Sequence, residues 1–182
     1  HLVGQAAPKN KPSKITVKEP VRPSGLPEEG RFAFLVHPLY LKNYLEFDQA
    51  LGAFSEPELK NLVDRWNDLV EPFVVAKTRI TSKTGATAYG EFICVCRTSE
   101  ELMNLPKEQV QAELEAAVKL AKERGAGIVG LGAYTSVVSK GGRDLRNLGV
   151  ALTTGNSYTV SAAVDATLEA ARRLEAPIER TL

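Results

Sequence analysis

LPKEQVQAELEAAVKLAKERGAGIVGLGAY, residues 105–134, decides the fold of this chain. Its first part has Val110, Leu114, Ala117, Val118 and Ala121 at helical spacing, and Gly125 suits the left-handed conformation that ends a helix. Residues 127–134 then have the apolar density of a buried strand that runs into a loop. A helix that leads directly into a buried strand is typical of folds in which helices connect parallel strands.

The same alternation continues on both sides of this stretch. Downstream, residues 148–153 predict another strand and residues 157–174 another helix, with Val160, Val164, Leu168 and Ala171 expected to face inward. Upstream, residues 31–37 form a short apolar run suited to a buried strand, and Pro38 ends it. These strands are expected to pair in parallel.

Residues 41–97 predict two helices followed by a hairpin. The first helix is expected over residues 41–51, and the second begins at Ser55, where Glu58 completes a capping box. Its buried face is expected to hold Leu59, Leu62, Val63, Trp66 and Val70. The β-rich runs 73–81 and 88–97 flank a glycine-containing turn, which favours an antiparallel pair. We therefore expect a single α/β domain with a mainly parallel sheet, crossover helices and an added antiparallel β-hairpin.

The amino-acid composition limits the number of domains and the kinds of binding partner. The chain has 182 residues, of which 43% are hydrophobic and 25% charged, and a formal net charge of +1. These values fit one globular domain and give no support for nucleic-acid binding. No apolar run reaches the roughly 20 residues of a membrane-spanning helix, and no secretory signal is evident, so a cytoplasmic location is expected.

The beginning of the chain differs in composition from the rest. Residues 1–30 contain half of the ten prolines together with Lys9, Lys11, Lys14 and Lys18, which predicts a linker or arm before a domain over residues 31–182. The single methionine is Met103, so the sequence has no initiator and is interpreted as a segment of a longer protein.

Two polar turns follow predicted strands, at the edge where open α/β sheets bind ligands. The first turn runs through Gly130 and Gly132 to Tyr134, Thr135 and Ser136, and its glycines could admit a ligand close to the backbone. It lacks the third glycine of the dinucleotide fingerprint, so NAD is not expected there. The second turn contains Thr153, Thr154, Gly155, Asn156 and Ser157 before a helix, whose free amides favour a carboxylate, a phosphate or a carbonyl oxygen. An ordinary helix cap is the commoner explanation of a turn with this composition.

The remaining candidates are isolated side chains. His37 ends the first strand and could hold a substrate oxygen or supply a proton, although a structural role is more common for a lone histidine. Cys94 and Cys96 are two residues apart on a strand, a spacing poor for a disulfide and insufficient for zinc, so buried structural thiols are expected. No metal site is predicted.

The segments 130–138 and 152–159, at this separation, resemble paired motifs of the long-chain acyl-(acyl-carrier-protein) reductases and their bacterial relatives described as predicted amino-acid dehydrogenases. The strand ending in His37 and the sequence Gly90-Glu91-Phe92-Ile93 are also similar to that family, though more loosely. The resemblance covers the chain from about Phe32 to its last residue.

The resemblance implies that this domain forms the substrate side of an NAD(P)H-dependent oxidoreductase that reduces a fatty acyl thioester to an aldehyde. NADPH would be bound mainly by a Rossmann domain that is expected after residue 182 and is absent here. The nucleophilic cysteine of the family lies beyond the matched stretch, and neither Cys94 nor Cys96 matches it. No catalytic residue is therefore expected within these 182 residues, and the fragment alone should be inactive.

The substrate-binding residues expected from the motifs come from the end of the first strand and from the two turns. They are His37, Tyr134, Thr135, Ser136, Thr153, Thr154, Gly155, Asn156 and Ser157. A basic set follows the first turn, namely Lys140, Arg143 and Arg146, and could contact an acidic acyl carrier protein or a coenzyme A phosphate. Exposed solvated charges are the commoner explanation of such a set.

Two other functions remain open. The domain could be a non-catalytic module that docks a carrier protein within a multidomain chain, which the proline- and lysine-rich arm suggests. It could also be the substrate domain of a dehydrogenase that acts on a small amino or keto acid, because two-domain dehydrogenases share this general plan.

Overall fold

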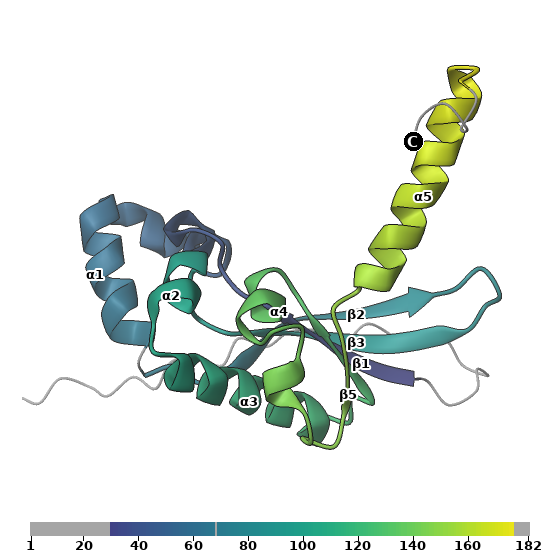
Figure 1. Ribbon diagram of the computed structural model, residues 1–182. Helices are drawn as coiled ribbons and strands as arrows, with labels where there is room; N and C mark the ends of the chain where they lie inside the picture. Colours follow the sequence, from purple (N-terminus) through teal and green to yellow (C-terminus); the bar gives the residue numbers. More distant parts are fainter. Residues whose placement is uncertain (1–29, 68, 177–182) are drawn as a thin grey trace, which may run out of the picture.

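A five-stranded sheet organises the protein, in a computed structural model that describes residues 30–67 and 69–176. The strand order is β2-β3-β1-β4-β5 (Figure 1). The strands are β1 (Gly30–Val36), β2 (Phe73–Thr81), β3 (Thr87–Cys94), β4 (Ile128–Leu131) and β5 (Ala151–Thr153). The helices are α1 (Glu56–Asn67), α2 (Ser99–Asn104), α3 (Lys107–Glu123), α4 (Tyr134–Val138) and α5 (Asn156–Arg173), with 3₁₀ helices η1 (Leu41–Glu46), η2 (Gln49–Ala53) and η3 (Arg143–Leu145).

The pairing confirms the predicted α/β class. β1 pairs in parallel with β3 on one side and with β4 on the other, and β4 pairs in parallel with β5. β2 is antiparallel to β3, so the predicted hairpin is also confirmed. Its turn contains Gly85, whose φ of 85° lies in the left-handed region that glycine adopts without strain.

One face of the sheet is covered by α3, as its apolar periodicity predicts. Val110, Leu114, Ala117, Val118 and Ala121 are all buried against the inward side chains of the central strands. Those inward side chains are Ala33, Leu35, Ile93, Val129 and Leu131. Gly125 ends the helix with a φ of 87°, as expected. This contact forms the main core.

The opposite face of the sheet is poorly covered within the described residues. Phe34 and Ile128 point to this face and are 37% and 42% exposed. In register, Phe32 lies between Gly90 and Ile128, and Phe34 lies between Phe92 and Gly130. A mainly parallel sheet normally has both faces buried. An apolar surface therefore remains open here, and we call it the bare face.

Helix α5 departs from the prediction for its inward residues. Figure 1 shows it leaving the sheet and pointing away from the other helices. None of its residues is buried, and Val160, Val164 and Leu168 are 62%, 51% and 45% exposed. The helix itself was predicted correctly, but the expectation that these side chains face inward is wrong for the described part of the chain.

The segment between β1 and β2 also differs in detail. The helix expected over residues 41–51 is two short 3₁₀ helices, because Asp48 takes an extended conformation between them and accepts a hydrogen bond from the Ala50 amide. At the start of α1, Glu58 accepts a hydrogen bond from the Ser55 amide, which confirms the predicted reach back, but the Ser55 hydroxyl donates to Glu58 as well and does not cap a helix amide. Leu62 and Trp66 are 37% and 41% exposed, so their expected burial is wrong.

The buried stripe of α1 runs instead through Leu59, Val63 and Asn67. Asn67 is held by Tyr44, whose hydroxyl donates to its side-chain oxygen at 3.0 Å, and it donates to Glu101 at 2.9 Å. A polar residue therefore takes the inward position that an apolar stripe alone would not assign to it.

A buried acidic residue ties α3 to the sheet. Glu91 on β3 is 4% exposed and accepts hydrogen bonds from the guanidinium of Arg124 and from the hydroxyl of Tyr89. Burial alone raises the pKa of Glu91, but the hydrogen bonds and charge of these partners outweigh it and hold the pKa below its ordinary value.

The ends of the sequence fall largely outside this description. The predicted arm over residues 1–30 lies outside the described residues except for Gly30, and so do residues 177–182. Within residues 30–67 and 69–176, none of the helices has the length and apolar character that crossing a bilayer requires.

Candidate functional site

Three neighbouring parallel strands bring the predicted site residues to one edge of the sheet. β1 ends just before His37, β4 ends at Leu131 and β5 ends at Thr153. Leu35 pairs with Leu131, and Gly130 pairs with Thr153, so the two polar turns leave adjacent strands at the same level. The two polar turns therefore lie side by side at the carboxyl edge of the parallel strands, as the sequence analysis expected.

His37 is fixed by hydrogen bonds at both ring nitrogens. Nδ1 donates to the carbonyl oxygen of Pro38 at 2.9 Å, and Nε2 accepts from the backbone N–H of Tyr134 at 3.1 Å. Burial lowers the pKa of His37, although hydrogen bonds to the backbone of Pro38 and Arg97 partly offset that effect. A neutral ring therefore joins the end of β1 to the first turn, and neither nitrogen is left for a substrate in this arrangement.

The first turn is a sharp change from strand to helix, so the expectation that the strand runs into a loop is wrong. Ala133 has φ 45° and ψ −123°, a conformation rare for a residue with a side chain, and α4 begins immediately after it. Thr135 is fully buried, and its hydroxyl donates to the carbonyl oxygen of Gly132 at 2.7 Å. Tyr134 is exposed and Ser136 is half-buried. Of the three predicted hydroxyls, those of Tyr134 and Ser136 are the ones that remain near the surface.

The glycines of the first turn serve packing. A Cβ on Gly130 would lie 2.4 Å from the ring of Phe34, and a Cβ on Gly132 would lie 2.4 Å from the carbonyl oxygen of Leu35. On the neighbouring strand, a Cβ on Gly90 would lie 2.0 Å from the Phe32 ring. The rings of Phe32 and Phe34 thus occupy the space that side chains at Gly90 and Gly130 would need. Packing therefore explains these glycines without the expected approach of a ligand.

The second turn leads into α5 through a left-handed residue. Gly155 has φ 71° and open space around its Cα, and the turn is held by the hydroxyls of Thr153 and Thr154, which accept hydrogen bonds from the amides of Gly155 and Asn156. No side chain caps the helix. Asn156 and Ser157 are exposed in its first turn. Beyond Asn156, the first amides of this 18-residue helix have no side-chain acceptor among the described residues, and they favour a negatively charged or carbonyl oxygen.

An apolar hollow on the bare face begins at this second turn. It has a volume of about 370 Å³, and its lining includes Phe32, Phe34, Ala88 and Ile128 together with Thr153 and Gly155. The sequence interpretation did not include it. The available signal was the alternation of Phe32 and Phe34 opposite glycines 90 and 130, but recognising it requires the strand register, which the sequence does not give.

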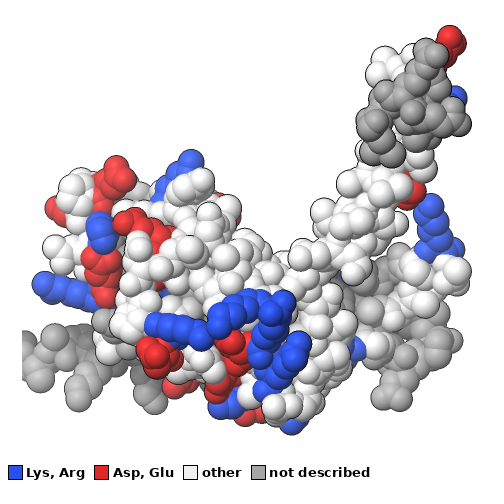
Figure 2. Space-filling view, in the orientation of Figure 1, with Lys and Arg blue, Asp and Glu red and all other residues white. Residues whose placement is uncertain are grey.

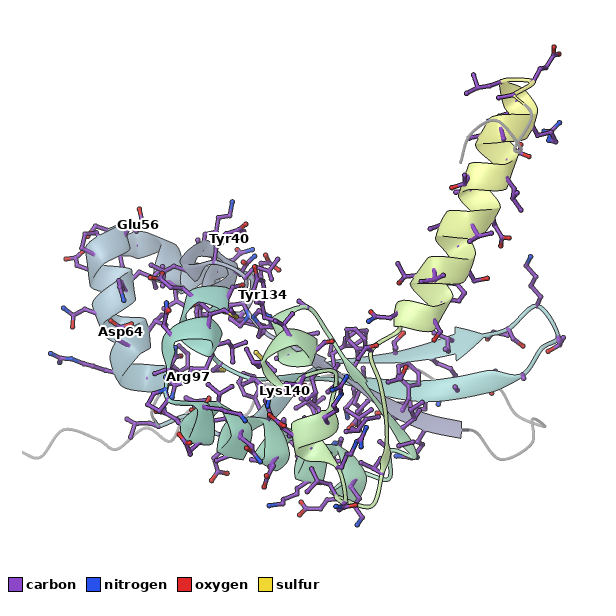
Figure 3. All side chains as sticks on the ribbon, in the orientation of Figure 1. Tyr40, Glu56, Asp64, Arg97, Tyr134 and Lys140 are labelled. Carbon is purple, nitrogen blue, oxygen red and sulfur yellow. The ribbon has the colours of Figure 1, made fainter. Side chains whose placement is uncertain are left out.

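The basic set lies beside the first turn, on the side of the sheet that α3 covers. Figure 2 shows blue side chains gathered there, and Figure 3 labels Lys140 among them. Lys140 and Lys107 both contact Asp144, at 3.8 and 3.1 Å, and hydrogen bonding to Lys107 lowers the pKa of Asp144. Arg143 and Arg146 are exposed.

The two cysteines lie at the same edge, where Cys94 is the last residue of β3 and pairs with Val36 of β1, and Cys96 follows β3. Their sulfur atoms are 4.0 Å apart, and both thiols are free. Cys94 is buried and Cys96 is half-buried.

No model of a known protein family matches the chain.

Proposed function

We propose that this domain binds the acyl thioester in an NAD(P)H-dependent reductase that converts fatty acyl thioesters to aldehydes. The observation that carries the proposal is the apolar hollow on the bare face, which starts at the polar second turn. An acyl thioester needs both features, because its chain is apolar and its carbonyl oxygen accepts hydrogen bonds. The cytoplasm is the proposed location.

In this proposal the acyl chain lies over the rings of Phe32 and Phe34, and the carbonyl oxygen lies toward the start of α5. The first-turn amides of α5 and its dipole stabilise the negative charge that develops on that oxygen. Asn156 and Ser157 are placed to orient the thioester, with Tyr134 and Ser136 on the neighbouring turn. NADPH held by a following domain would supply the hydride to the carbonyl carbon, and the carrier thiol would leave as the C–S bond breaks.

The group that carries the acyl chain is proposed to meet the basic set. Lys140, Arg143 and Arg146 follow the first turn, and Gly141 approaches Thr154 of the second turn. A coenzyme A phosphate or an acidic carrier protein is complementary to this charge. These residues extend the proposed site from the thioester toward its carrier.

Binding of decanoyl-coenzyme A, measured by isothermal titration calorimetry at fixed salt concentration, tests the proposal. Ile128→Ser removes an apolar side chain from the hollow, and the affinity should fall about fivefold. Ile80→Ser is the matched control, because Ile80 is also an exposed isoleucine on a strand, at 53%, and does not line the hollow. Coenzyme A alone reports binding through the carrier group.

An unchanged affinity for Ile128→Ser, or an equal loss for both variants, would reject the acyl site. Tighter binding of small amino or keto acids than of decanoyl-coenzyme A would favour the small-acid dehydrogenase. Binding of an acyl carrier protein with no difference between its acylated and free forms would favour a docking module without a substrate site.

A further inference from the structure

A second hollow lies away from the proposed acyl site, between α1, α2 and the loop that follows β1. It has a volume of about 580 Å³, and we call it the α1–α2 groove. Its apolar lining consists of Leu39, Leu41, Val63 and Leu105. Figure 3 shows Tyr40, Glu56 and Asp64 at this end of the molecule, which the bare face does not reach.

The charged lining of the groove is mostly acidic. Four carboxylates line it, from Glu56, Asp64, Glu100 and Glu101, whereas Lys60 is the one cation among its lining residues. Lys60 is already engaged, because its ammonium donates to both carboxylate oxygens of Asp64 at 3.0 and 3.1 Å. Figure 2 shows red side chains gathered over this end of the molecule.

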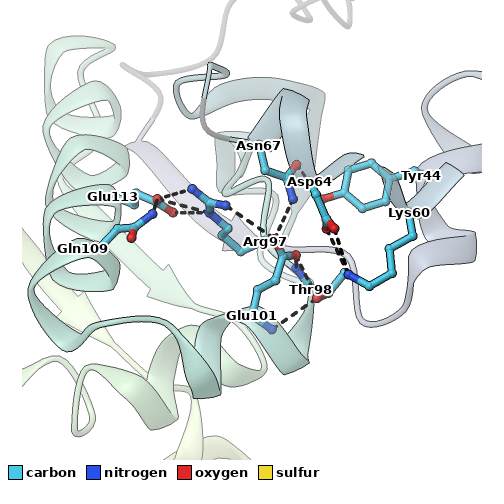
Figure 4. Close-up of polar contacts among 9 residues, drawn as sticks. All are labelled: Tyr44, Lys60, Asp64, Asn67, Arg97, Thr98, Glu101, Gln109 and Glu113. Carbon is cyan, nitrogen blue, oxygen red and sulfur yellow. Dashed lines mark hydrogen bonds and ion pairs between the residues drawn. The ribbon is translucent and has the colours of Figure 1, made fainter. Parts of the chain in front are cut away.

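Two of these carboxylates are free to meet a ligand. Glu101 is occupied by Thr98, Asn67 and Arg97, as Figure 4 shows. Glu56 and Glu100 are exposed and form no ion pair within the described part of the chain. Like-charge repulsion disfavours phosphates, carboxylates and acidic proteins in this groove. A ligand with both apolar groups and ammonium groups is complementary to its apolar and acidic lining.

We propose that the α1–α2 groove docks a lysine-containing peptide segment, and that residues 9–18 of this chain, KNKPSKITVK, are that segment. Their sequence contains four lysines and no acidic residue, with Ile15 and Val17 as apolar side chains. The charges are complementary to the rim of the groove, and the apolar side chains match its lining.

The length of the chain allows this contact. The groove begins three residues after β1, and β1 has 7 residues, so it lies about 30 Å from Gly30. The twelve residues from Lys18 to Gly30 can span up to about 40 Å. Residues 9–18 can therefore reach the groove from the beginning of β1. The proposal is independent of the acyl site, which lies on other residues.

Zero-length carbodiimide cross-linking of the full chain, followed by mass spectrometry, tests the contact. Cross-links from Lys9, Lys11, Lys14 and Lys18 should form mainly with Glu56 and Glu100. Glu123 is the internal control, since it is exposed and lies at the end of α3 near the beginning of β1, closer to the attachment point of the segment. Cross-links that favour Glu123 would overturn the proposal.

A binding titration tests two points separately: whether the groove binds the peptide, and whether residues 9–18 of the same chain already fill it. In a chain with the four lysines changed to glutamine, the synthetic peptide of residues 9–18 should bind, and Glu56→Gln with Glu100→Gln should weaken it at least fivefold. Glu123→Gln is the matched control and should leave the affinity unchanged. Two results would reject the groove as the binding site of the peptide. One is no binding, and the other is equal affinity for the chain with Glu56→Gln and Glu100→Gln and for the chain with Glu123→Gln. Equally tight binding to the wild-type chain would show that residues 9–18 do not fill it.

Discussion

Gly132, at the point where the first turn leaves β4, has no room for a side chain. A Cβ there would lie 2.4 Å from the carbonyl oxygen of Leu35, and this backbone atom also accepts the Gly132 amide hydrogen bond at 3.1 Å. Gly132→Ala must therefore displace β1 from β4, and we expect it to lower the free energy of unfolding by about 3 kcal/mol. Urea denaturation monitored by circular dichroism measures this change.

Gly30→Ala is the control for that measurement. Gly30 belongs to β1, the strand that Gly132→Ala would displace, but a Cβ on Gly30 would meet no atom within 4 Å. The free energy of unfolding should change by less than about 0.5 kcal/mol. Equal effects of the two substitutions would contradict the steric explanation for Gly132.

Individual residues were predictable where local chemistry dominates and not where tertiary contacts decide. The hydrogen bond that the Ser55 amide donates to Glu58 and the left-handed conformation of Gly125 could both be predicted from neighbouring residues in the sequence. Thr135 could not be distinguished from Ser136, because its burial depends on how α4 packs against α2 and α3. Whether the nine predicted residues bind substrate stays a prediction.

At the scale of elements, α5 is the least supported long helix. It has 18 residues, none of them buried, and an isolated helix of that length is only marginally stable in water. By contrast, α3 buries five side chains in the main core. We expect the amides of α5 to exchange with deuterium at least 100-fold faster than those of the centre of α3, as measured by hydrogen-exchange mass spectrometry at neutral pH.

The comparison has an internal control within the same chain. Peptides from the hairpin turn, residues 82–86, should exchange as fast as α5 or faster, because the turn is exposed and its hydrogen bonds close only within the turn itself. Protection of α5 equal to that of α3 would mean that another surface covers its apolar side chains. The prediction of an unsupported helix would then be wrong.

Elements were predictable in type but not always in packing. The apolar stripe of α3 indicates both the helix and its buried face, because a sheet lies directly beneath it. The stripe of α5 looks similar in sequence, yet nothing in the described residues covers it. Periodicity identifies a face that avoids water but not the surface that it contacts. The short helix α2 was missed because Thr98 and Glu101 form its capping box within a stretch of only six helical residues.

For the whole molecule, two buried groups should make stability depend on pH in separate ranges. Burial lowers the pKa of His37 below 6.5, so the unfolded chain binds a proton there more readily than the folded chain. Stability should therefore fall as the pH drops below about 6.5 and toward the lower pKa of the folded state. Thermal unfolding between pH 8 and pH 5 measures this loss, and His37→Gln should flatten it.

Glu91 affects the free energy of unfolding at a lower pH than His37 does. Its pKa in the folded state lies below its ordinary value of 4.5, so its contribution is complete above pH 4.5 and is lost as the pH falls through the folded-state pKa. Because Arg124 is partly exposed, we expect Glu91→Gln to lower the free energy of unfolding at pH 7 by about 2 kcal/mol. A stability that is flat with pH in both ranges for the wild-type chain would contradict both assignments.

The overall architecture could be predicted because strands and helices alternate strongly from residue 105 onward. The convergence of the two turns also followed, since carboxyl ends of adjacent parallel strands share an edge. The bare face, the apolar hollow and the α1–α2 groove did not follow, because each depends on strand register or on how distant segments pack.

The two outer strands of the sheet have a consequence for self-association. β5 has only 3 residues, too few to template the addition of a foreign strand. The other border, β2, carries Lys77 and Arg79, and its register shifts between Val74 and Ala76. Charge and irregularity of this kind discourage edge-to-edge stacking into fibres. The bare face, which nothing within residues 30–67 and 69–176 covers, thus lies between two sheet borders that resist polymerisation.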